Sequence, residues 1–144
     1  MIEEKDRQLL LKDLCARLPY GVKVNVWEYQ YAETLVGLDV NKQTFNLEHS
    51  IGEQIFSRHY DLIIKPYLRP MPSMTEQEKE IYETFVEYWE YDTGSLNGHY
   101  EYNYVEIDKI NDFVDWLNAH HFDYRGLIDK GLALEAPEGI YKIE

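Results

Sequence analysis

The chain has 144 residues, a hydrophobic share of 44% and a formal net charge of −13. This length and composition are typical of one globular domain, and the negative charge disfavours direct binding to nucleic acid or to an anionic membrane, since both need a basic face. The single cysteine, Cys15, excludes an internal disulfide, and the sequence has no apolar run of signal-peptide or membrane-spanning type, so we expect a soluble cytoplasmic protein.

The first half of the sequence predicts one helix followed by a small sheet. Residues 3–18 carry leucines at helical spacing, with acidic residues in the first turn. Apolar and polar residues then alternate with a period of two, which is typical of half-buried strands. This alternation predicts strands at residues 22–27, 33–40, 44–48 and 61–65. Several short strands in succession indicate a bent antiparallel sheet, and an SH3-like barrel is one form that it can take.

Two details of this half lead to specific expectations. Pro66 and Pro70 come after the last predicted strand, and because proline cannot donate to a ladder, they should confine this segment to an edge or a loop. Cys15 lies beside Leu11 and Leu14 in the predicted helix, so we expect it to be a small buried hydrophobic residue rather than a catalytic thiol.

A long helix is predicted to open the second half of the chain. Thr75 with Glu78, and Ser73 with Glu76, each have the spacing of a capping box, in which two side chains satisfy the first free amides of a helix. We expect this helix to run from Thr75 to about Tyr91, where turn-forming residues begin.

After this helix the sequence predicts a short strand, two further helices and a hairpin. Tyrosines alternate with polar residues over residues 100–104, which favours a strand. Asp108 can cap the next helix, whose apolar residues recur at i, i+3, i+4 and i+7. Asp123 can begin a last short helix, and residues 133–135 and 140–141 can form a final hairpin around a Pro-Glu-Gly turn.

These elements place the chain in the α+β class. Residues 1–144 are predicted to form a single domain, because no flexible linker or low-complexity tract divides them. Within it, residues 1–72 form the helix and the sheet, and residues 73–144 form an acidic helical part.

Most of the negative charge falls in one quarter of the chain. Residues 73–108 carry a net charge of −9, whereas residues 1–72 carry −1 and residues 109–144 carry −3. Acidic residues recur in the long predicted helix at steps of four, three, four and three, and we call them the glutamate row: Glu76, Glu80, Glu83, Glu87 and Glu90. Such steps put the row on one stripe of the helix, where like charges destabilise it. The row is therefore a candidate partner-binding surface, opposite a predicted dry side of Ile81, Phe85, Tyr88 and Trp89.

The charge density of the row limits mimicry of nucleic acid. The row spans about 21 Å at 1.5 Å per residue, or one charge per roughly 5 Å, whereas duplex DNA carries one per about 1.7 Å. One helix is too sparse to imitate a duplex, so the acids of residues 101–115 would have to join the same surface. Inhibition by mimicry of nucleic acid stays an alternative function.

Aromatic residues lie close to the row in the sequence. Trp89, Tyr100, Tyr102 and Tyr104 are residue types that commonly anchor protein interfaces. Their neighbours are acids, whereas aromatic platforms for nucleic acid are accompanied by arginine and lysine. A protein partner is therefore favoured for this cluster, and packing of a tyrosine strand against the acidic helix is the simpler explanation.

Motifs for enzymatic chemistry are sparse. His120, His121 and Asp123 could serve a small metal-dependent hydrolase, but adjacent residues on a helix point about 100° apart, and no second ligand cluster completes a site. Histidines near a helix C-terminus are favoured by its dipole in any case. The sequence has no glycine-rich phosphate loop or nucleophile elbow. We therefore predict no catalytic residue, bound metal or cofactor.

Three runs of the sequence resemble a known family. They are Leu10–Val24 (LLKDLCARLPYGVKV), Ile64–Thr75 (IKPYLRPMPSMT) and Asp115–Tyr141 (DWLNAHHFDYRGLIDKGLALEAPEGIY). Together they are similar to small uncharacterised proteins encoded by anaerobic gut bacteria and their prophages. The resemblance implies an origin in a mobile element, and it implies no activity and no functional residue.

The sequence favours a non-enzymatic function. We expect an accessory factor of a prophage or mobile element that binds a protein, with a basic partner facing the acidic, tyrosine-rich surface. The alternatives are an inhibitor that mimics nucleic acid and the metal-dependent hydrolase. The identity of the partner and the oligomeric state stay open.

Overall fold

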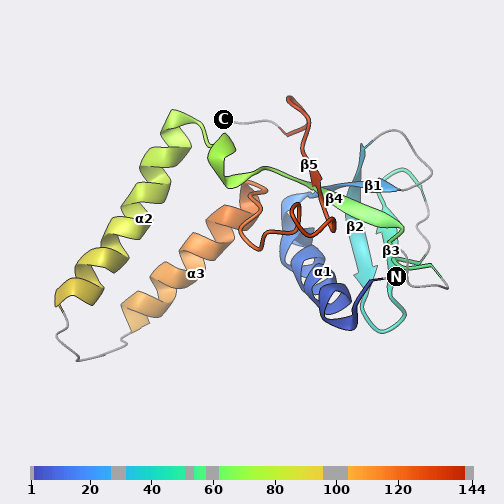
Figure 1. Ribbon diagram of the computed structural model, residues 1–144, viewed down its shortest axis with the longest axis horizontal. Helices are drawn as coiled ribbons and strands as arrows, with labels where there is room; N and C mark the ends of the chain where they lie inside the picture. The colour runs from blue at the N-terminus through green and yellow to red at the C-terminus, as the bar shows by residue number, and fades with distance from the viewer. Residues whose placement is uncertain (1, 27–31, 51–53, 58–61, 96–103, 142–144) are drawn as a thin grey trace.

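The computed structural model describes residues 2–26, 32–50, 54–57, 62–95 and 104–141, and for residues 87–95 and 104–107 the description covers the backbone alone. The chain forms two parts (Figure 1). The body consists of helix α1 and a five-stranded sheet, and the arm consists of helices α2 and α3, which project from the body together. The predicted α+β class is therefore confirmed. The helices span Glu4–Arg17 (α1), Glu76–Ser95 (α2) and Tyr104–Ala119 (α3), and the strands span Lys23–Val26 (β1), Ala32–Asp39 (β2), Thr44–Leu47 (β3), Ile64–Leu68 (β4) and Leu134–Glu135 (β5).

The sheet is open and mixed. Its strand order is β3-β2-β1-β4-β5, and neighbouring strands are antiparallel except β4 and β5, which are parallel. Because β3 and β5 lie at opposite edges, the sheet does not close, so an SH3-like barrel and a purely antiparallel sheet are both wrong. The predicted C-terminal hairpin is also wrong, because β5 pairs with the free edge of β4, where Leu134 lies opposite Tyr67.

Strand β4 continues through a proline in the interior of the sheet. The prediction that Pro66 confines the chain to an edge or a loop is wrong, since Pro66 lies opposite Val24 of β1. The amide of Lys23 faces β4, so the amide of the next residue, Val24, faces β2 instead. Pro66 therefore occupies a position where β1 requires no amide hydrogen, and no bond of that ladder is lost.

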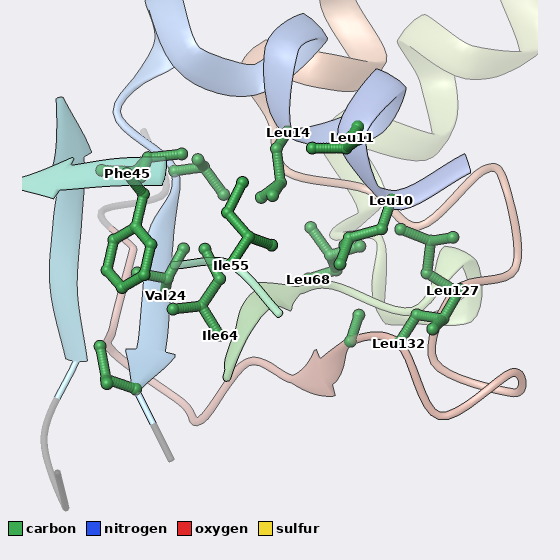
Figure 2. Close-up of a cluster of buried hydrophobic side chains, with 14 of the residues drawn as sticks. Leu10, Leu11, Leu14, Val24, Phe45, Ile55, Ile64, Leu68, Leu127 and Leu132 are labelled. Carbon is green, nitrogen blue, oxygen red and sulfur yellow. The ribbon is translucent and has the colours of Figure 1, made fainter. Parts of the chain in front are cut away.

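The apolar core lies between α1 and the inner face of the sheet (Figure 2). Leu10 and Leu14 of α1 meet Val24, Phe45 and Ile64 of the strands, and each of these side chains is at most 2% exposed. Burial alternates along β1, which confirms the period of two that predicted the strand. Full burial of an apolar side chain of this size stabilises the fold by about 1.5–3 kcal/mol.

The buried side of α1 differs in one respect from the expected one. Cys15 is exposed, so its predicted burial is wrong. The charged residues Asp13 and Arg17 are instead fully buried beside Leu14. Their mutual ion pair lets the helix bury them in place of the thiol.

Helix α2 begins with the capping box that the sequence predicts at Thr75 and Glu78. The amide of Thr75 donates to Glu78 Oε1 at 2.9 Å, and the amide of Glu78 donates to Thr75 Oγ1 at 3.2 Å. The alternative start at Ser73 is wrong, because the Ser73 hydroxyl donates to the carbonyl of Pro70. The helix continues to Ser95, beyond the predicted end.

Helix α3 begins at Tyr104, so the predicted strand over residues 100–104 is wrong at its last residue, and residues 100–103 lie outside the described part. The helix ends in a Schellman motif: the amide of Phe122 donates to the carbonyl of Leu117 at 3.0 Å, and that of His121 to Asn118 at 3.1 Å. His121 has a φ of 63°, in the left-handed region that glycine usually occupies at this position.

The chain then turns back to the sheet without the predicted last helix. The Asp123 carboxylate accepts the amides of Leu127 and Ile128 at 2.8 and 3.0 Å. These bonds organise a series of turns, because both carboxylate oxygens are used across one short loop. Among the described residues, no helix combines the length and the apolar character needed to cross a membrane.

Candidate functional site

The outer side of α2 carries the described part of the glutamate row. Glu80 and Glu83 are exposed, and neither takes part in an ion pair among the described residues. The opposite side packs on α3, with the ring centroids of Tyr82 and Phe85 lying 5.7 and 4.9 Å from that of Phe113. Residues three and four apart share one helix face, so these glutamates point away from α3.

Glu76 belongs to the same exposed surface, although it also contacts a lysine. Lys79 Nζ lies 3.2 Å from Glu76 Oε1, and both side chains are well exposed to water. A pair of this kind contributes about 0–1 kcal/mol. The predicted dry side is only partly correct, because Phe85 packs inward but Ile81 is 40% exposed at its margin.

The other predicted site residues are not placed by their side chains. The backbones of Glu87, Trp89 and Glu90 continue α2, and that of Tyr104 begins α3. Tyr100 and Tyr102 lie outside the described residues. Exposed acids also occur on α3, at Asp108, Asp112 and Asp115.

A buried ion pair joins the arm to the sheet. Arg69 follows β4, and its Nη1 and Nη2 donate to Glu78 Oε2 and Oε1 at 2.7 and 2.6 Å. The two side chains are 8% and 4% exposed. Burial alone would raise the pKa of the Glu78 carboxyl, but Arg69 and the amide of Thr75 hold this pKa below its usual value. Glu78 therefore stays ionised within the junction.

A second buried ion pair is formed by two residues on the inner side of α1. Arg17 Nε donates to Asp13 Oδ2 at 2.8 Å, and Arg17 Nη2 donates to the carbonyl of Phe122 at 2.6 Å. Arg125 Nε approaches Asp13 Oδ1 at 3.3 Å. Burial raises the pKa of the Asp13 carboxyl by more than Arg17 and Arg125 lower it. Because Asp13 and Arg17 are both 0% exposed, this pair is closed to a dissolved substrate.

His121 and Tyr141 stack in the same region. Their ring centroids are 3.6 Å apart, and the Tyr141 hydroxyl accepts the amide of Lys23 and donates to the carbonyl of Tyr67, both at 2.8 Å. Burial, with Arg17 next in importance, lowers the pKa of His121 to about 4. The imidazole is therefore neutral at physiological pH.

The histidine cluster does not gather as a metal site. His120 Nδ1 lies 2.9 Å from the carbonyl of Trp116, and the Asp123 carboxylate is occupied by backbone amides. No group of three or more histidine, cysteine, aspartate or glutamate side chains suited to a metal ion occurs among the described residues. These contacts give His120 and Asp123 structural roles at the end of α3.

A cavity of about 290 Å³ opens where β4 leaves the body. It lies between Arg69, Ser73 and residues 135–141, and the titratable side chains that line it are those of Arg69, Glu135, Glu138 and Tyr141. Arg69 is held by Glu78 and Tyr141 by the strands, while Glu135 and Glu138 are exposed. The Ser73 hydroxyl, which also lines the cavity, donates to the carbonyl of Pro70.

Sequence reasoning missed the buried charges because burial is a property of the assembled fold. The capping pattern identified Glu78, but nothing in its spacing pointed to Arg69, which precedes α2 by a proline-containing turn. The i, i+4 spacing of Asp13 and Arg17 is a signal that could have suggested their ion pair. The distant partner of Arg17, the carbonyl of Phe122, has no local signal.

Three separate runs of the sequence meet at these junctions. Leu10–Val24 supplies Arg17, Ile64–Thr75 supplies Arg69, and Asp115–Tyr141 supplies the carbonyl of Phe122. Comparisons with protein-family models, with curated proteins and with solved structures gave no match to this chain.

Proposed function

We propose that this chain is a non-enzymatic protein-binding factor that presents the glutamate row of α2 to a basic partner. The observation that carries the proposal is the arrangement of Glu80 and Glu83. Both are exposed, and they lie on the side of α2 opposite the rings that pack on α3. The resemblance to prophage-encoded proteins supports a role as an accessory factor of a mobile element.

Two physical considerations support recognition of a basic surface. Like charges at these steps cost a few tenths of a kcal/mol per pair, and a positive partner would relieve that repulsion. Charge complementarity across a rim also accelerates association and selects the partner. The exposed acids of α3, Asp108, Asp112 and Asp115, extend the negative field around the same arm.

The two alternatives receive less support. Mimicry of nucleic acid requires the acids of α2 and α3 to share one surface, whereas Glu80 and Glu83 point away from α3. A hydrolase at His120, His121 and Asp123 requires donors that are free to bind, and the described contacts engage His120 and Asp123 with the backbone.

Neutralising the row tests the proposal. We expect the triple variant Glu80→Gln, Glu83→Gln, Glu87→Gln to bind a partner captured from an anaerobic gut bacterium about tenfold more weakly, with a smaller dependence on salt. The measurement is calorimetric titration of the purified partner at low and at physiological ionic strength. Circular dichroism should show unchanged helix content, because glutamine and glutamate have similar helix propensities.

The matched control removes three exposed acids elsewhere. The variant Asp129→Asn, Glu135→Gln, Glu138→Gln changes the net charge by the same amount, and it should leave binding unchanged. Equal affinity for the row variant and the wild type would refute the assignment of the surface. Release of DNA from a DNA-binding partner on addition of the protein would instead favour mimicry.

A further inference from the structure

The contacts that hold α2 are of two kinds. Within the arm, Tyr82 and Phe85 join α2 to Phe113 of α3 through apolar ring contacts. At the base of the arm, Glu78 joins α2 to Arg69 at the end of β4 through two short hydrogen bonds. Apolar attraction is non-directional, whereas a bidentate pair between guanidinium and carboxylate has a fixed planar geometry.

Arg69 also holds the end of the second arm helix. Its Nη1 donates to the carbonyl of His120 at 3.2 Å, and its guanidinium lies 4.4 Å from the ring centroid of Phe122. Its backbone amide donates to the carbonyl of His121 at 2.7 Å, and its carbonyl accepts the amide of Asp123 at 2.9 Å. One residue of the body thus contacts the first turn of α2 and the segment that follows α3.

The segment that follows α3 is held from the other side as well. Arg17 of α1 donates to the carbonyl of Phe122, and Arg69 donates to the carbonyl of His120. Two arginines of the body therefore bond to the carbonyls of the residues on either side of His121. His121 keeps a φ of 63°, a conformation that costs a non-glycine residue free energy and persists only when its surroundings impose it. Several bonds therefore fix the end of α3 on the body, whereas the described ion pair between α2 and the body is made by Glu78 alone.

We propose that Arg69 is a positioning residue whose ion pair with Glu78 sets the direction of α2 relative to the body, and thereby where the glutamate row is presented. The glutamate row lies along α2, the helix whose direction this ion pair sets. Glu90 is 12 residues beyond Glu78, or about 18 Å of helix, so a tilt of about 20° at the pair would displace it by about 6 Å. A displacement of this size would move the carboxylates of the glutamate row out of contact with the cationic groups of a partner.

Residual dipolar couplings of the backbone amides test the proposal, because they report the direction of each helix independently of stability. In the full-length wild type, one alignment tensor should fit α1, the sheet and α2. In Glu78→Gln, and in the apolar double variant Arg69→Met, Glu78→Leu, the couplings of α2 should need a separate tensor with about half the magnitude of that of the body. The double variant matters because an apolar replacement of a buried pair often preserves stability.

The matched control breaks the exposed pair one residue further along α2. Lys79→Gln removes the contact with Glu76 and should leave all couplings on one tensor. A single unchanged tensor in the apolar double variant would overturn the proposal, because the aromatic contacts would then suffice to direct α2. The direction of α2 is tested without a partner, and only its effect on partner binding rests on the proposed function. A changed tensor together with unaltered binding by the row variant would refute the proposed function and leave the positioning role of Arg69 intact.

Discussion

The body and the arm use charged residues in opposite ways. In the body, Asp13 and Arg17 are withdrawn completely from water, where they pair with each other and contact Arg125 and the carbonyl of Phe122. On the arm, Glu80 and Glu83 stay in water without an ion pair among the described residues. Glu78 follows the behaviour of the body although it lies beside the glutamate row in the sequence, since its side chain is buried as the partner of Arg69. Where a charge is buried, the fold supplies its partner, and where it is exposed, water solvates it.

The largest expected effect sharpens this contrast between buried and exposed pairs. Arg17→Gln removes the cation that donates to the buried Asp13 carboxylate and leaves only Arg125 beside it, so the variant should lower the free energy of unfolding by about 3–5 kcal/mol. Lys79→Gln breaks an exposed pair and should lower it by less than about 1 kcal/mol. Urea denaturation of both variants at neutral pH provides the comparison. Similar losses in the two variants would show that burial does not separate the two regions energetically.

A smaller effect tests the neutral histidine at the junction. The pKa of His121 is lowered from 6.5 to about 4 in the folded protein, so the unfolded chain takes up a proton first as the pH falls. His121 should therefore contribute a loss of stability on acidification of about 2 kcal/mol between pH 7 and pH 5, while the raised pKa of Asp13 contributes with the opposite sign. Denaturant titrations at the two pH values measure this loss.

The variant His121→Asn isolates the contribution of the imidazole. Asparagine tolerates the left-handed conformation and does not titrate, so most of the loss between pH 7 and pH 5 should disappear. The lowered pKa of Glu78 contributes a loss of the same sign, but only below about its ordinary value of 4.5. An equally steep pH dependence in His121→Asn would assign the effect to other groups.

The smallest predicted effect concerns the start of the arm. Thr75→Ala removes the hydroxyl that accepts the amide of Glu78, and it should lower the free energy of unfolding by about 1 kcal/mol. The control is Thr84→Ala in the same helix, where the hydroxyl donates to the carbonyl of Glu80 and the alanine favours the helix by a few tenths of a kcal/mol. Thermal unfolding of the pair should thus shift in opposite directions, and equal shifts would refute the capping role.

Elements encoded by local patterns were predictable from the sequence. The alternation along β1 and the capping box at Thr75 and Glu78 depend on neighbours within a few residues, and both are confirmed. The predicted strand at residues 61–65 was displaced to Ile64–Leu68, because the acceptability of Pro66 depends on which way the amide of its partner faces. The missing hairpin has a similar cause, since β5 finds its partner in β4 and not in the residues that come after it.

The candidate site also contains some residues whose placement follows from local spacing and others whose placement depends on the tertiary fold. Helical spacing was sufficient to place Glu80 and Glu83 on an exposed stripe. It could not distinguish Phe85, which packs on α3, from Ile81, which lies at the margin, because that distinction depends on where α3 lies. The exposed Cys15 was misplaced because the apolar pattern of α1 did not reveal that the body buries a salt bridge.

The Tyr141 hydroxyl affects the order in which the body can be completed. Continued by one pair, the register of β1 and β4 would put Lys23 opposite Tyr67, and the Tyr141 hydroxyl bonds to the backbone of both residues. Tyr141 follows Lys23 by 118 residues, so the first residue of the first strand is satisfied by a side chain that is synthesised much later. Contacts of such sequence separation are slow to form, because a long segment of chain must be ordered before they contribute. The first strand of the sheet thus reaches its final set of hydrogen bonds only after Tyr141 has been synthesised.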